Sequence, residues 1–66
     1  DVLVFSDSRH LAQAIRHIRS LTQDGLTVEN SVFDQLDAAA DYARKRGIRR
    51  LHLVDDRIQE LDPETL

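Results

Sequence analysis

The chain has 66 residues, of which 41% are hydrophobic and 32% are charged, and its formal net charge at pH 7 is −3. This length allows one small domain with a modest core, and the composition is typical of a globular chain. The sequence contains no cysteine, which excludes disulfides, zinc–thiolate sites and thiol nucleophiles. The net negative charge argues against a general attraction to nucleic acid.

No apolar run approaches the roughly 20 residues needed to cross a bilayer, so we expect no membrane partner. The chain begins DVLVF, without a methionine or a basic leader. The absence of cysteine favours the cytoplasm. We therefore expect residues 1–66 to form a single cytoplasmic domain excised from a longer protein.

The first half of the chain predicts a buried strand, a helix and a second strand. Residues 2–5 form a short apolar run that is followed by a Ser-Asp-Ser sequence, and these residue types cap helices. Apolar residues then recur at helical spacing over residues 8–24, and Gly25 is expected in the left-handed conformation after the last turn. Residues 26–28 give a weaker strand signal. The apolar face of this helix is predicted to hold Leu11, Ala14, Ile15, Ile18 and Leu21.

The second half predicts another helix followed by two strands. The helix has an apolar stripe and an acidic stripe, and Gly47 ends it. A third strand is expected at residues 51–54, an Asp-Asp turn after it, and a fourth strand at 57–61. The apolar stripe holds Leu36, Ala39, Ala40 and Ala43, and the acidic stripe holds Asp34, Asp37 and Asp41.

This order of elements, β-α-β-α-β-β, predicts a small α/β sandwich of two or three layers with a mostly parallel sheet. The two-residue turn before the fourth strand indicates that this strand pairs antiparallel at an edge. One sheet edge would remain uncovered, so we expect either further structure or a partner there.

Two groups of basic residues are candidate contacts for nucleic acid or for a protein partner. One group lies on the first helix, and the other surrounds the end of the second helix, where cations compensate the helix dipole. The chain has only two phenylalanines and one tyrosine to stack on bases, so a solvated or partner-facing surface is favoured over a phosphate grip. Asp41 and Lys45 are spaced for an exposed ion pair. The candidate contact residues are Arg9, Arg16, Arg19, Arg44, Lys45, Arg46, Arg49 and Arg50.

The three histidines do not predict a metal site. His10 and His17 are seven residues apart on a helix instead of four, and no fixed carboxylate is expected beside them. His52 alternates with two leucines on a strand, so we expect it to pack beneath a helix.

Three aspartates are expected at the carboxyl ends of the first and third strands, the edge at which open α/β sheets bind ligands. Roles in caps and turns are favoured there, with a magnesium site as the alternative. The serines lack the context of an activated nucleophile. We therefore expect no catalytic residue, no cofactor and no metal. The aspartates are Asp7, Asp55 and Asp56.

The segment from Gln35 to Ile48 (QLDAAADYARKRGI) feeds a strand that ends in Asp-Asp, and Gly47 follows Tyr42 by five residues. Together with the opening DVLVF strand, the long helix and the TVE sequence, this pattern resembles the C-terminal anticodon-binding domain of the class II histidyl-tRNA synthetase family. The resemblance covers nearly the whole chain. It implies an anticodon-binding-like α/β fold and a C-terminal position in the parent protein.

The resemblance implies two functions, and the second helix discriminates between them. In synthetases, the start of this helix typically carries lysines and a glutamine that suit contact with RNA, whereas this chain has Asp37, Ala38 and Ala39 there. A glycine-rich approach is replaced by Glu29-Asn30-Ser31. The chain is therefore more similar to the version in regulatory subunits of ATP phosphoribosyltransferase, which support histidine biosynthesis by assembling with a catalytic subunit. The alternative is an anticodon-binding domain that contacts tRNA.

Overall fold

A computed structural model describes residues 1–30 and 35–65, so Ser31 and Asp34 of the predicted patterns lie outside the described residues. In these two ranges no helix is long and apolar enough to cross a membrane. The elements are β1 (Val2–Ser6), η1 (Ser8–His10), α1 (Leu11–Gln23), β2 (Val28–Asn30), α2 (Leu36–Arg46), β3 (Arg50–Val54), β4 (Ile58–Leu61) and η2 (Pro63–Thr65), where η marks a 3₁₀ turn.

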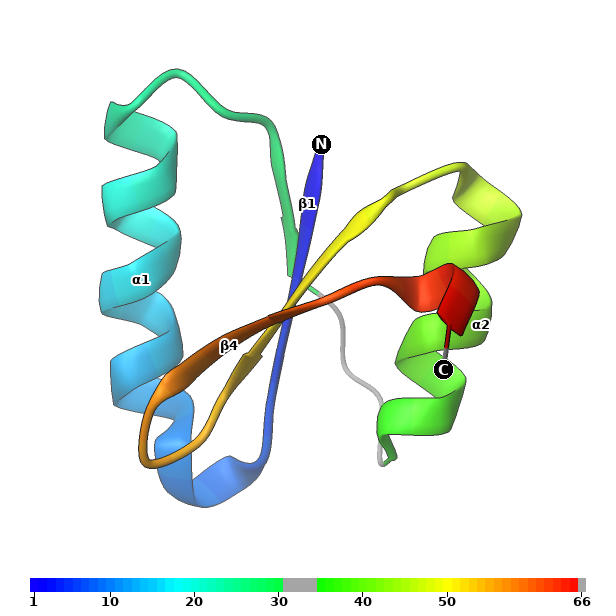
Figure 1. The fold of residues 1–66 in the computed structure, drawn as a ribbon. Helices are drawn as coiled ribbons and strands as arrows, with labels where there is room; N and C mark the ends of the chain where they lie inside the picture. Colours follow the sequence, from blue (N-terminus) through cyan, green and yellow to red (C-terminus); the bar gives the residue numbers. More distant parts are fainter. Residues whose placement is uncertain (31–34, 66) are drawn as a thin grey trace.

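The four strands form one mixed sheet with the order β2-β1-β3-β4. β1 pairs in parallel with both β2 and β3, and β4 pairs antiparallel with β3, as the short turn predicts. The chain crosses from β1 to β2 on one side and returns past β1 to β3. Right-handed connections in these opposite directions place the helices on opposite faces, as Figure 1 shows. The sandwich therefore has three layers.

Alternation along β1 divides the core into two clusters. Val2 and Val4 face α1, whereas Leu3 and Phe5 face α2. All four residues are buried, which explains why β1 is a continuous apolar run and not an alternating one. The α1 cluster is completed by Ala14, Leu21 and Val54, and the α2 cluster by Ala39, Ala40, Ala43, Ile48 and Leu51.

Both helices end in a Schellman motif around a glycine with positive φ, 87° at Gly25 and 71° at Gly47. After α1, the N–H of Leu26 donates to the carbonyl oxygen of Leu21 (3.1 Å). Ile48 has the same position after α2, and both residues pack into the core. The predicted left-handed conformation of Gly25 is confirmed.

Two predicted boundaries were wrong for reasons of local geometry. The second strand lies at Val28–Asn30 and not at 26–28, because Leu26 belongs to the motif that ends α1. The long helix begins at Leu11 because Ser8–His10 form a 3₁₀ turn.

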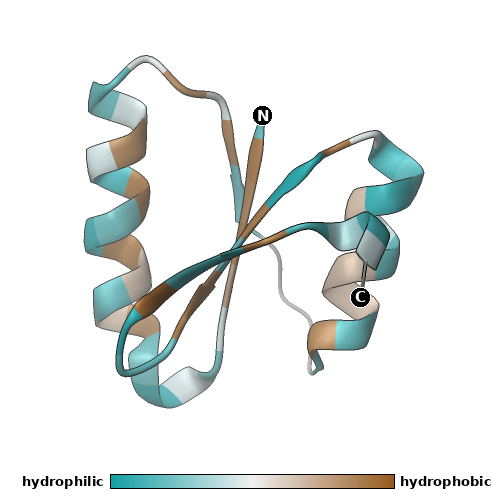
Figure 2. Cartoon of the chain, in the orientation of Figure 1, coloured by the Kyte–Doolittle hydropathy of each residue, from teal (hydrophilic) through white to brown (hydrophobic). Residues whose placement is uncertain are grey.

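The predicted apolar face of α1 was also wrong in part. Ala14 and Leu21 are buried, but Leu11 is 51% exposed and Ile15 42% exposed. These two residues lie about 60° and 100° around the helix from Ala14, on one flank of its buried stripe. Hydrophobic residues therefore extend from the inner face of α1 onto its surface. Figure 2 colours the hydrophobic segments of the helix brown.

The alanine stripe of α2 predicts sensitivity to side-chain size. Ala40 is buried against the sheet, so Ala40→Leu should overpack this interface and lower the free energy of unfolding by about 1–3 kcal/mol. Urea denaturation would measure the change. The matched control is Ala38→Leu on the exposed side of α2, where we expect a change within about 0.5 kcal/mol. Equal effects of the two substitutions would contradict the assigned face.

Candidate functional site

The basic residues at the end of α2 are largely engaged within the chain. Lys45 lies 3.1 Å from Asp41, which confirms the predicted pair, and Arg46 lies 2.8 Å from Glu29. Arg44 donates to a carbonyl oxygen of η2 (2.7 Å) and lies 3.6 Å from Asp41. The hydrogen bond and charge of Lys45 lower the pKa of Asp41. This cluster therefore compensates the helix end and pairs with acidic neighbours.

The remaining basic residues are divided between paired and unpaired ones. Arg50 pairs with Glu60 (2.9 Å), and Arg9 with Asp7 (3.4 Å). Arg44, Lys45 and Arg46 lie on α2 and Arg16 and Arg19 on α1, on opposite sides of the sheet, so the fold does not bring all eight candidates to one surface (Figure 1). Among the described residues, those of the eight that have no ion pair are Arg16, Arg19 and Arg49.

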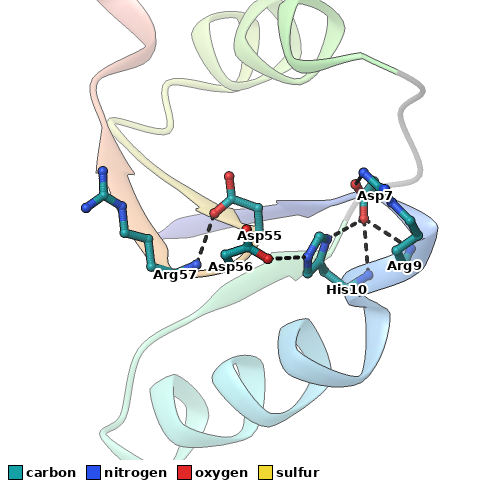
Figure 3. Close-up of polar contacts among 6 residues, drawn as sticks. All are labelled: Asp7, Arg9, His10, Asp55, Asp56 and Arg57. Atoms are coloured by element: carbon teal, nitrogen blue, oxygen red, sulfur yellow. Dashed lines mark hydrogen bonds and ion pairs between the residues drawn. The ribbon is translucent and has the colours of Figure 1, made fainter.

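A polar cluster lies at the carboxyl ends of β1 and β3, as predicted for its aspartates (Figure 3). Asp7 caps η1, because its Oδ1 accepts from the main-chain N–H groups of Arg9 (3.0 Å) and His10 (3.1 Å). The ring of His10 then bridges two carboxylates: Nδ1 lies 2.7 Å from Asp7 and Nε2 lies 3.3 Å from Asp56. Asp55 accepts from the main-chain N–H of Arg57 (3.1 Å) and shapes the turn into β4.

This arrangement stabilises the imidazolium form of His10. The hydrogen bond that His10 donates to Asp7, followed by the one that it donates to Asp56, raises the pKa of His10, and the bond accepted from His10 lowers the pKa of Asp7. The expectation that no carboxylate accompanies this histidine was wrong. The spacing of Asp7 and His10 across one helical turn was a usable signal, whereas the contact with Asp56, 46 residues away, was not.

The magnesium alternative receives no support from this geometry. Asp7 and Asp55 direct oxygens at main-chain N–H groups, and Asp56 contacts a histidine. Within the described ranges, no group of three or more histidine, aspartate or glutamate residues is arranged to hold a metal ion. The contacts of His10 join η1, at the start of α1, to the β3–β4 turn, and we call Asp7, His10 and Asp56 the clasp. The arrangement does not resemble a cation site.

A second histidine contact joins the middle of α1 to the sheet. His52 is 5% exposed beneath α1, which confirms the prediction of a histidine packed under a helix. Its Nδ1 lies 2.7 Å from Nε2 of His17, and its Nε2 lies 2.8 Å from Glu60 on β4. Burial, followed by the charge of His52, lowers the pKa of His17. Sequence analysis missed this contact because the two histidines are 35 residues apart.

Comparisons of the chain with protein-family models, curated proteins and solved structures found no match.

The clasp predicts a change in histidine titration. Asp7→Asn keeps an oxygen that can cap η1 but removes the charge beside His10, so the pKa of His10 should fall toward its ordinary value of 6.5. NMR titration of the ring protons measures this pKa.

The clasp also makes stability depend on pH. Because the folded-state pKa of His10 is raised, its contribution to stability is present below pH 6.5 and is lost as the pH rises through the folded-state pKa. The substitution should weaken this dependence.

Asp55→Asn is the matched control for that titration. Asp55 also lies at a strand end, but it bonds the main chain of Arg57 and not His10. We expect the pKa of His10 to stay the same in this variant. An unchanged pKa in Asp7→Asn would show that the clasp does not form in solution.

Proposed function

We propose that the chain is a non-catalytic protein-interaction module of a histidyl-tRNA synthetase-like regulatory subunit of ATP phosphoribosyltransferase, acting in cytoplasmic histidine biosynthesis. The resemblance of residues 35–48 to that family supports this proposal, and the β-α-β-α-β-β order is compatible with it. The module would contact the catalytic subunit or its own parent chain.

The observation that carries the proposal is the exposed apolar row on α1. Leu11, Ile15 and Arg19 follow one another at intervals of four residues, so they form a ridge along one flank of the helix. Leu11 and Ile15 are large aliphatic residues that are about half exposed. Aliphatic residues beside arginine are typical of the surfaces that proteins use to bind each other. We call these three residues the α1 ridge.

The pairing of the α2 cations favours a protein partner over RNA. Glu29 accepts a hydrogen bond from Tyr42 (2.8 Å) and pairs with Arg46. Glu29 belongs to the Glu-Asn-Ser segment that departs from the synthetase pattern, and its charge offsets that of Arg46 at the end of α2. Asp37 adds an exposed negative charge to the first turn of the same helix. RNA binding depends on several unpaired cations that meet phosphates. Of the five basic residues around the end of α2, only Arg49 has no ion pair within the described residues.

The charge of α1 favours tRNA binding as a second candidate function. Residues 11–23 contain no acidic side chain, and among the described residues Arg16 and Arg19 have no ion pair. These arginines are exposed on the outer side of the helix. An anticodon-binding domain would use such a row to follow a phosphate backbone.

Titrations with the catalytic phosphoribosyltransferase subunit and with histidine tRNA test the two functions. Fluorescence anisotropy at low and physiological salt would compare the wild-type chain with Leu11→Ser/Ile15→Ser. We expect the chain to bind the catalytic subunit with little dependence on salt. The double substitution should weaken that binding at least about tenfold, because each aliphatic side chain contributes about 1.5 kcal/mol or more when buried.

Two further variants separate the outcomes. Gln13→Ser, on the other flank of α1, is the matched control and should bind like the wild type. Tight, salt-sensitive binding to tRNA that is lost in Arg16→Gln/Arg19→Gln and kept in the Leu11/Ile15 variant would overturn the proposal and establish the second function. Circular dichroism of each variant would show whether the helices remain folded.

A further inference from the structure

One continuous chain of hydrogen bonds runs through three elements on the α1 side of the sheet. His17 on α1 contacts His52 on β3 (2.7 Å), and His52 contacts Glu60 on β4 (2.8 Å). The middle ring is buried, and the two imidazoles lie with centroids 4.9 Å apart. This chain is separate from the clasp at His10 and from the α1 ridge, which lies on the opposite flank of the buried stripe.

The partners fix where the protons lie. Glu60 is an acceptor, and its contacts with His52 and then Arg50 lower its pKa, so Nε2 of His52 carries a proton. In a neutral His52 the other nitrogen, Nδ1, is then an acceptor. His17 must therefore donate to it from Nε2. With both rings neutral, every nitrogen in the two contacts has a partner.

Adding protons changes this chain in two unequal steps. With one charge on the pair, one of the two facing nitrogens still donates and the other still accepts, so the contact between the rings survives as a charge-assisted bond. A second charge places a proton on both facing nitrogens, Nε2 of His17 and Nδ1 of His52. Two N–H groups would then face each other across 2.7 Å, with a positive charge on each ring and one ring buried.

The surroundings offer only limited compensation for the second charge. On β4 the facing ionisable group is Glu60, and on β3 itself the nearest cation is Arg50, which is paired with that same glutamate (2.9 Å). The β1 residue opposite His52 is Val4, which is apolar, and α1 contributes only His17 to this contact. One carboxylate therefore contacts both Arg50 and His52, and His17 reaches it only through the ring of His52.

We propose that His17, His52 and Glu60 form a proton-operated latch that holds α1 on the sheet while the two histidines share at most one charge, and that opens when both are charged. Opening separates the middle of α1 from β3 and leaves α2 in place on the other face. The latch does not depend on the proposed function.

The direction of the pH effect follows from linkage. Burial and the neighbouring His52 lower the folded-state pKa of His17 below its ordinary value of 6.5. The unfolded state then binds more protons, so the contribution of the latch to stability is present above pH 6.5 and is lost as the pH falls through the folded-state pKa. His10 changes stability in the opposite direction, so it cannot account for a loss in acid.

NMR of the 66-residue chain tests the latch without any substitution. At pH 7.5, the ring nitrogens of His52 should show a proton on Nε2 and none on Nδ1. As the pH is lowered to 4.5, the hydrogen-exchange protection of α1 amides near His17 should fall about tenfold or more, while α2 amides keep theirs. A proton on Nδ1 at pH 7.5, or protection that falls equally in both helices or in neither, would overturn the proposal.

Two variants assign the acid step to the latch. His17→Gln keeps an N–H donor for His52 but cannot take a second charge, so the loss of α1 protection in acid should disappear. His10→Gln, the matched control in η1 directly before this helix, should retain it. A step that persists in His17→Gln or disappears in His10→Gln would show that the acid step does not come from the contact between His17 and His52 and would overturn the latch.

Discussion

The burial of β1 on both faces is the constraint on which the rest of this structure depends. A strand with parallel neighbours on each side and a helix on each face has no position for a polar side chain between Val2 and Phe5. The two crossovers must then run in opposite directions, which separates α1 from α2. Each histidine contact is consequently confined to the α1 side of the sheet or to its carboxyl edge.

α1 is the element where these consequences meet. It is attached to the sheet by an apolar stripe and by two histidines, His10 at its start and His17 near its middle. Carboxylates favour the charged form of His10, and burial favours the neutral form of His17. One helix therefore combines two ionisable attachments with opposite preferences, while its outer surface remains available for a partner.

Sequence analysis predicted the order of elements because local signals specify it: a continuous apolar run for β1, helical spacing, and glycines where helices end. It failed where tertiary contacts decide the outcome. The periodicity of α1 cannot show that Leu11 and Ile15 remain about half exposed. The partners of His10 and His52 come from distant strands, so spacing reveals neither. Among the cations of α2, an ion pair was predicted only for Lys45, because its partner Asp41 lies one helical turn away.

The two halves of the core also differ in how volume is shared. Toward α2, the strand supplies the bulky Leu3 and Phe5 and the helix supplies alanines. Toward α1, the strand supplies two valines and the helix supplies an alanine and a leucine. A slip of β1 by one residue would turn the bulky pair against α1 and leave valines facing alanines, with crowding on one face and voids on the other. The unequal packing of the two layers thus selects the correct strand register against its nearest competitor.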